Sequence, residues 1–147
     1  MTAALASATP DLLGPRARAT AGYADAGDAV VTPRQAEYRV FARVTHRLAA
    51  ALAAAAPAGS GPAVRTAAFA RMAEAVNDNR RLWAALAADL AAPRNGLPDA
   101  LRAQLISLAA FTLAQSERVL SGAATAEPLV EINRSVMRGL RGDAEAG

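Results

Sequence analysis

The side chains that could do chemistry in this chain are few and scattered. His46 is the single histidine, cysteine is absent, and Ser107 and Ser116 lie within one predicted helix without a plausible base nearby. A nucleophile needs such a base, and a zinc site needs several histidine or cysteine ligands. The pattern also contains no paired carboxylates for acid–base catalysis and no glycine-rich phosphate loop. We therefore expect no enzyme, no metal site and no cofactor.

Asn79 is the polar residue with the most informative surroundings. It interrupts an apolar seam of heptad-like spacing, formed by Phe69, Met72, Val76, Asn79, Trp83, Leu86 and Leu90. A polar residue in such a seam can fix register and partner choice, or it can hydrogen-bond to a loop backbone. Trp83 is the single tryptophan, and its place in the seam predicts a buried side chain whose replacement by alanine costs roughly 3–5 kcal/mol.

Helical spacing of the apolar residues predicts the elements that hold this seam. Thr32 and Pro33 form a helix start signal, the stretch from Pro57 to Pro62 a flexible connector, and Gly122 a helix stop. The sequence predicts an all-α bundle with four principal helices, near residues 33–56, 63–91, 98–121 and 127–141.

Two of these predicted helices differ in how their apolar residues are distributed. The helix over 33–56 carries a single apolar stripe of Tyr38, Phe41, Val44, Leu48 and Leu52, and His46 lies on the opposite, polar side. The helix over 98–121 is apolar on more than one side. We expect it either to form the centre of the bundle or to offer a spare face to a partner.

The chain divides into a body and two flanking segments. Residues 1–31 hold few large apolar side chains and are expected to form a flexible segment with one possible short helix. Residues 32–142 form the helical domain, and residues 143–147 a disordered acidic tail. The absence of cysteine, of a signal peptide and of a membrane-spanning run favours a cytoplasmic location.

Four segments of the chain are similar to a known family. They are Glu37–Thr45, Asp78–Trp83 continuing to Leu90, Asn95–Arg102 and Glu131–Gly142. In this order and spacing, over about residues 32–142, they resemble the flagellin-synthesis regulator family FlaF of alphaproteobacteria. The resemblance implies a cytoplasmic protein needed for flagellum biogenesis, which binds flagellin as an export chaperone or a secretion-linked regulator.

A small bundle with spare apolar faces is compatible with such a partner, because it can receive an amphipathic helix in a groove. We expect a binding surface that includes the last helix and its neighbours, with the candidate residues Tyr38, Asn79, Trp83, Asn133, Met137 and Arg138. No small-molecule substrate is expected.

Two alternatives remain open at this point. Every basic side chain other than His46 is arginine, so the chain could regulate flagellin messenger RNA by binding it. The arginines are spread singly, however, as on a solvated surface. The seam around Asn79 could instead join identical chains in a structural homo-oligomer.

Overall fold

Helices make up nearly all of the part of the chain that the computed structural model describes, residues 33–146. No strand occurs in this range, which confirms the all-α prediction. The predicted flexible segment 1–31 and its possible short helix lie outside the described residues. The helices are α3 (Pro33–Ala53), α4 (Pro62–Ala91), α5 (Asp99–Leu120) and α6 (Glu127–Ala146).

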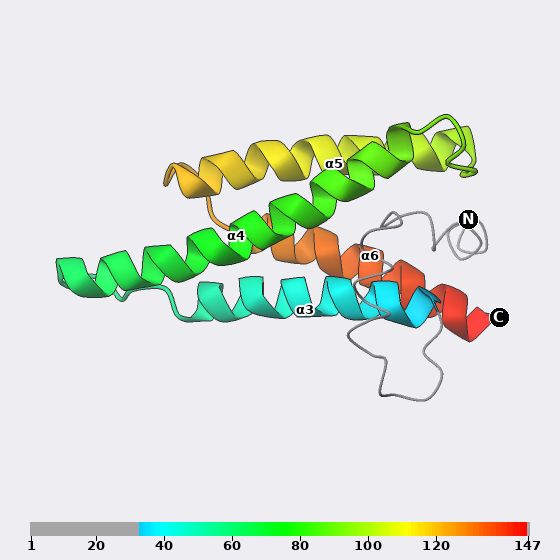
Figure 1. The fold of residues 1–147 in the computed structure, drawn as a ribbon. Helices are drawn as coiled ribbons and strands as arrows, with labels where there is room; N and C mark the ends of the chain where they lie inside the picture. The colour runs from blue at the N-terminus through cyan, green and yellow to red at the C-terminus, as the bar shows by residue number, and fades with distance from the viewer. Residues whose placement is uncertain (1–32, 147) are drawn as a thin grey trace.

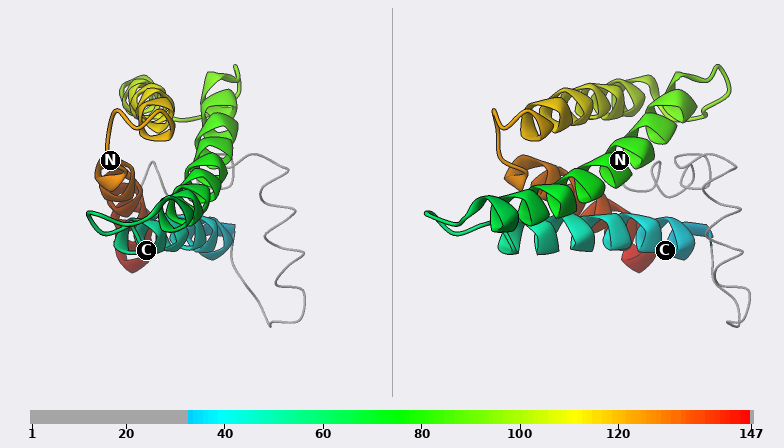
Figure 2. Two further views of the ribbon diagram at one scale, coloured as in Figure 1. Left: turned by 90° about the vertical axis from the view of Figure 1, so that its left-hand side faces the viewer. Right: turned by 60° about the vertical axis from the view of Figure 1, so that its left-hand side comes forward.

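The helices run antiparallel to their neighbours in an up-and-down bundle (Figure 1). The long helix α4 packs along both α3 and α5, and α6 packs along α3. By contrast, α5 and α6 make few contacts, and α4 and α6 lie diagonally opposite without close backbone contact. The view down the bundle in Figure 2 shows this arrangement.

None of the four described helices lies at the centre of the bundle, because each occupies one corner of it, so the prediction that the helix over 98–121 occupies the centre is wrong. That helix, α5, packs mainly against α4 and has no close contact with α3. Its apolar residues reach two different sides of the helix that are open to solvent, where Phe111 and Ile106 are exposed. The other expectation for this helix, a spare apolar face, describes the structure better.

The helix ends differ from the predicted ones at two places. α3 stops at Ala53 rather than Ala56, because the small, mostly exposed alanines that follow have little to pack against. α6 continues to Ala146, past the predicted stop at residue 141, whereas the disorder of the tail 143–147 stays a prediction. Glycine within a helix costs only about 1 kcal/mol relative to alanine, and Gly139 and Gly142 do not end this one.

Gly122 ends α5 as predicted, and the structure shows how. Its φ of 80° places it in the left-handed region that glycine adopts without strain. Gly122 N–H donates to the carbonyl oxygen of Val119 at 3.0 Å, and Ala123 N–H donates to that of Arg118 at 2.8 Å. These two bonds form a Schellman motif, which turns the chain towards α6.

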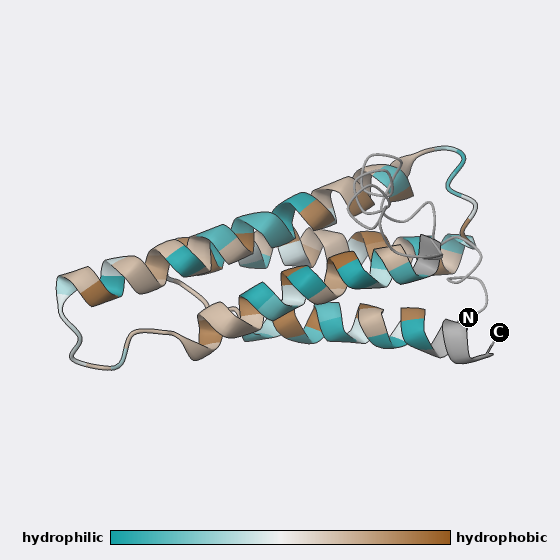
Figure 3. Ribbon diagram, turned by 60° about the horizontal axis from the view of Figure 1, so that its bottom comes forward, coloured by the Kyte–Doolittle hydropathy of each residue, from teal (hydrophilic) through white to brown (hydrophobic). Residues whose placement is uncertain are grey.

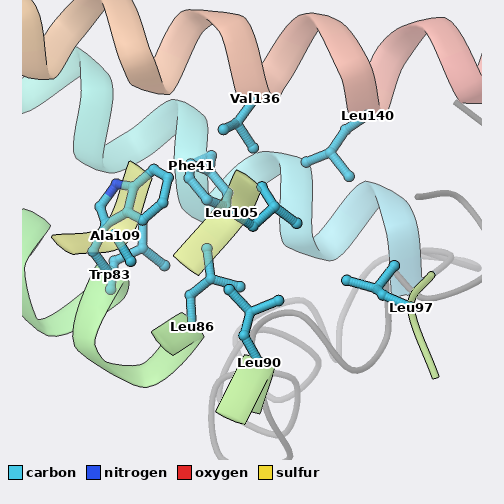
Figure 4. Close-up of a cluster of buried hydrophobic side chains, with 10 residues drawn as sticks. Phe41, Trp83, Leu86, Leu90, Leu97, Leu105, Ala109, Val136 and Leu140 are labelled. Atoms are coloured by element: carbon cyan, nitrogen blue, oxygen red, sulfur yellow. The ribbon is translucent and has the colours of Figure 1, made fainter. Parts of the chain in front are cut away.

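The helices are amphipathic, and each one carries both hydrophobic and hydrophilic residues (Figure 3). Their apolar faces form two separate clusters. Core 1, shown in Figure 4, consists of Phe41, Leu82, Trp83, Leu86, Leu90, Leu97, Leu105, Ala109, Val136 and Leu140. Core 2 lies towards the loop that joins α5 to α6 and consists of Leu48, Ala51, Ala75, Val76, Val119, Ala126, Leu129 and Val130.

A buried polar layer separates the two cores. Along every helix, the first buried polar residue met on passing from core 1 to core 2 occupies the same level of the bundle: Thr45 on α3, Asn79 on α4, Thr112 on α5 and Asn133 on α6. Their exposed fractions are 5% for Thr45 and 0% for the other three. We call these four residues the polar layer. On α5, the buried Gln115 and Ser116 follow Thr112 before core 2 begins.

Candidate binding groove and buried polar layer

A chain of hydrogen bonds crosses the bundle diagonally through the polar layer. Trp83 Nε1–H donates to Asn133 Oδ1 at 2.8 Å, and Asn133 Nδ2–H donates to Asn79 Oδ1 at 2.8 Å. The indole ring also meets Phe41 edge to face, with ring centroids 6.0 Å apart and planes at 86°. Asn79, a seam residue on α4, is thus hydrogen-bonded to α6, although the backbones of α4 and α6 make no close contact.

This network corrects the interpretations of the seam. Asn79 bonds to a side chain on α6, so the expectation of a bond to a loop backbone is wrong. The prediction that Trp83 is buried is confirmed. The seam closes within one chain from Met72 to Leu90, but Phe69 is 52% exposed. Phe69 belongs to neither hydrophobic cluster of the bundle. The first turns of α4 extend past the end of α5, as Figure 1 shows.

Burial separates the six predicted binding residues into two groups. Asn79, Trp83 and Asn133 are fully buried, so in this conformation they cannot touch a partner. Of the others, Tyr38 and Met137 are half-buried and pack against core 1.

Arg138, the sixth predicted residue, is exposed, and its Nη2 donates to Ser135 Oγ at 2.9 Å. Arg138 is the one predicted binding residue of the six that is fully exposed. Its partner Ser135 also lines a groove that was not predicted from the sequence.

This groove has a volume of about 640 Å³ and lies between α5 and α6. It exists because these two helices make few contacts with each other, so that their facing sides are not packed together above core 1. Its floor is formed by Phe41 and Leu86, and Leu105 and Val136 belong to core 1 as well. The remaining residues of its walls are Ala100, Leu101, Ala103, Gln104, Ser107 and Leu108 on α5 and Ser135 on α6.

Phe111 extends the α5 wall of the groove. It follows Gln104, Ser107 and Leu108 by seven, four and three residues, the spacings that place side chains on one side of a helix. The side chain is 48% exposed. Ile106 is 41% exposed but lies about 140° around the helix from Phe111, since successive residues are separated by about 100°. The two residues therefore allow the two sides of α5 to be compared.

A second depression, between α3 and α4, has a different character. It measures about 860 Å³ and is lined by alanines and charged side chains. Asp78 accepts from Arg47 at 2.6 Å and from Arg81 at 3.3 Å, and both arginine side chains are more than half exposed. Exposed pairs of this kind contribute little to stability. The alanines of this depression give it no large apolar side chain for a partner to bury against. Its Asp78 carboxylate is already paired with two arginines and therefore offers little free charge.

Among residues 33–146, no three histidine or carboxylate side chains come together in a way that could hold a metal ion. Within the same range, no helix combines the length and the apolar content that a membrane span requires.

The fold and the groove define a small antiparallel helical bundle whose core is partly open to one side. Comparison with family models places it more closely: the model described as flagellar protein FlaF matches residues 19–140. The chain belongs to the FlaF family, and it is a flagellar protein in that sense. Comparison with curated proteins and with solved structures gave no match.

Proposed function

We propose that this protein acts in the cytoplasm by binding flagellin in the groove between α5 and α6. In this role it is an export chaperone or secretion-linked regulator of flagellin synthesis and has no catalytic turnover. The observation that carries the proposal is the apolar groove itself, because an amphipathic helix can pack its apolar face against the groove lining, where Leu101 and Leu108 are only half-buried.

The length of the groove suits a helical segment of two to three turns. Its α5 wall extends from Ala100 to Leu108, about 12 Å at a rise of about 1.5 Å per residue, and Phe111 adds one more turn. Helices recognised in this way insert side chains spaced by three or four residues. Flagellin's terminal segments, as amphipathic helices, fit that description.

Polar side chains at the rim of the groove fix the orientation of a bound helix. Gln104, Ser107 and Ser135 line the groove beside the apolar floor, and the Arg138 guanidinium lies at its edge through its bond to Ser135. Arginine is enriched in protein interfaces, where it pairs with carboxylates and backbone carbonyls. We expect a bound helix to place an acidic residue or its C-terminal carbonyls near Arg138.

Co-purification with the host flagellin tests the proposal, with two charge substitutions on the same helix. Phe111→Glu adds a carboxylate on the groove side of α5, and Ile106→Glu adds one at similar exposure on the other side. We expect Phe111→Glu to remove most of the flagellin and Ile106→Glu to retain it. Equal recovery by both variants, each checked for native circular dichroism, would count against the groove.

The salt dependence of the capture separates this function from the RNA alternative. Binding to an apolar groove changes little between low and high salt, whereas binding to phosphates weakens steeply. The alternative would be established if the intact protein co-purified with no flagellin and instead captured flagellin messenger RNA in a salt-sensitive way. Recovery of the chain only with itself, as a dimer by sedimentation, would point to a self-association module.

A further inference from the structure

The two walls of the groove belong to helices that barely touch. α5 is held by α4, and α6 is held by α3. The width of the groove therefore depends on how α6 is placed relative to the α4–α5 pair, and direct packing between α5 and α6 contributes little to that placement.

Asn133 provides a connection at the required place. It lies two residues before Ser135 and three before Val136, which form the α6 wall. Its side-chain amide bonds to Asn79 and Trp83 on α4. Because α4 also supplies the groove floor through Leu86 and supports α5, these two bonds join one wall of the groove to the helix that carries the other.

We infer that Asn133 is a positioning residue that sets the width and depth of the groove through Asn79 and Trp83. This inference rests on the proposed function only for the identity of the partner. The geometric part, that Asn133 fixes α6 against α4, concerns the bundle itself.

The chemistry of the connection explains why a polar group does this better than an apolar one. Apolar contacts between helices are non-directional and tolerate small sliding movements, whereas a hydrogen bond holds its two atoms within a narrow range of distance and angle. A single polar residue in an apolar helix seam fixes register for the same reason. The Asn133 amide uses both its oxygen and its nitrogen, so translation of α6 in either direction breaks a bond.

Thr112 offers a matched contrast in the same layer. Its Oγ1 has no hydrogen-bond partner within the described part of the chain, and it lies on α5 rather than α6. Thr112→Val removes a buried polar atom of the layer without changing the connection between α6 and α4. Any effect of the layer's polarity as such would appear in both Thr112→Val and Asn133→Leu.

The first experiment measures the groove directly and needs no partner. The chain has no cysteine, so spin labels can be placed at Ser107→Cys and Ser135→Cys, one on each wall. In full-length protein we expect one narrow distance distribution, unchanged by Thr112→Val and shifted or broadened by Asn133→Leu. Asn79→Leu, which leaves the Trp83 bond in place, should give a smaller change and serves if Asn133→Leu does not fold.

The second experiment separates positioning from stability. Leu129→Ala destabilises core 2 and retains the side chains of the network, because Leu129 is fully buried in core 2, one turn of α6 before Asn133. At a temperature where every variant is folded, we expect Asn133→Leu to weaken flagellin binding by about tenfold or more, since the groove is no longer pre-organised. Leu129→Ala should bind as the unsubstituted chain does.

The outcomes distinguish the inference from the proposed function. An unchanged label distance in both Asn133→Leu and Asn79→Leu would overturn the positioning role. A loss of binding in Leu129→Ala equal to that in Asn133→Leu would overturn it as well, because stability alone would then explain the effect. If the distances change as expected and the intact protein captures no flagellin, the positioning role stands and the flagellin proposal fails.

Discussion

Replacing Trp83 by phenylalanine tests the buried network at its most informative atom. Phenylalanine retains an aromatic ring against Phe41 but has no Nε1–H to donate to Asn133 Oδ1. The substitution therefore removes one hydrogen bond from a site with 0% exposure, where water cannot replace it. Trp83→Ala, by comparison, removes the ring as well and should cost at least the roughly 3–5 kcal/mol expected for a buried aromatic residue.

The expected magnitude for Trp83→Phe has two parts. The acceptor left unsatisfied on Asn133 costs about 1–3 kcal/mol. The smaller ring leaves about 40 Å³ unfilled, which at about 24 cal/mol per Å³ adds about 1 kcal/mol. The free energy of unfolding should fall by about 2–4 kcal/mol, a large share of the about 5–15 kcal/mol typical of a domain.

Urea unfolding followed by far-UV circular dichroism measures this change, since the substitution removes the fluorescent residue. The same substitution in an Asn133→Leu background should cost no more than about 1 kcal/mol, because the acceptor is already gone and the buried Trp83 N–H is then itself without its partner. Equal losses in the two backgrounds would refute the hydrogen-bond contribution. A loss below about 1 kcal/mol in the original background would refute the burial of the indole.

Four further substitutions test other parts of the fold by the same urea titration. Thr112→Val should leave stability within about 0.5 kcal/mol or raise it, because its buried Oγ1 has no partner among the described residues; a loss above about 1 kcal/mol would contradict this. Gly122→Ala should cost about 1 kcal/mol or more, since an alanine at φ 80° is strained, and no loss would argue against the Schellman turn. Phe69→Ala should cost less than about 1 kcal/mol, whereas Leu90→Ala should cost about 2–5 kcal/mol; similar losses would place Phe69 in a core.

The helices and most of the core could be predicted because they depend on local information. Apolar residues at helical spacing identified Phe41, Leu48, Trp83 and Leu90 as core positions, and all four are buried. Start and stop signals near Pro33 and Gly122 placed helix ends correctly. These features follow from backbone geometry and from the period of the helix, which the sequence displays directly.

The failures arose where a residue's surroundings depend on another helix. Phe69 continues the heptad-like spacing, yet it is 52% exposed and belongs to neither core. Asn79 and Asn133 were both singled out, but a separation of 54 residues gave no signal that they would bond to each other. Both side chains lie buried inside the bundle, and their part in binding a partner stays a prediction.

The groove was the part of the candidate site furthest from prediction. Its existence depends on the angle between α5 and α6, which no local pattern specifies. The double-sided apolar character of the 98–121 helix was the one signal available, and it indicated a spare face without locating it. Arg138 was chosen as an interface residue and does lie at the rim, through its bond to Ser135.

Site-specific photo-crosslinking tests the central claim most directly, namely that flagellin binds between α5 and α6. A photoreactive phenylalanine analogue placed at Ser107 on the groove wall, or at Ile106 on the other side of α5, leaves the rest of the chain unchanged. With the host flagellin present, irradiation should give a covalent adduct from position 107 and none from position 106, with the attachment mapped by mass spectrometry to an amphipathic helix of flagellin. An adduct from position 106 alone, or none from either position while flagellin still co-purifies, would contradict the groove as the binding site.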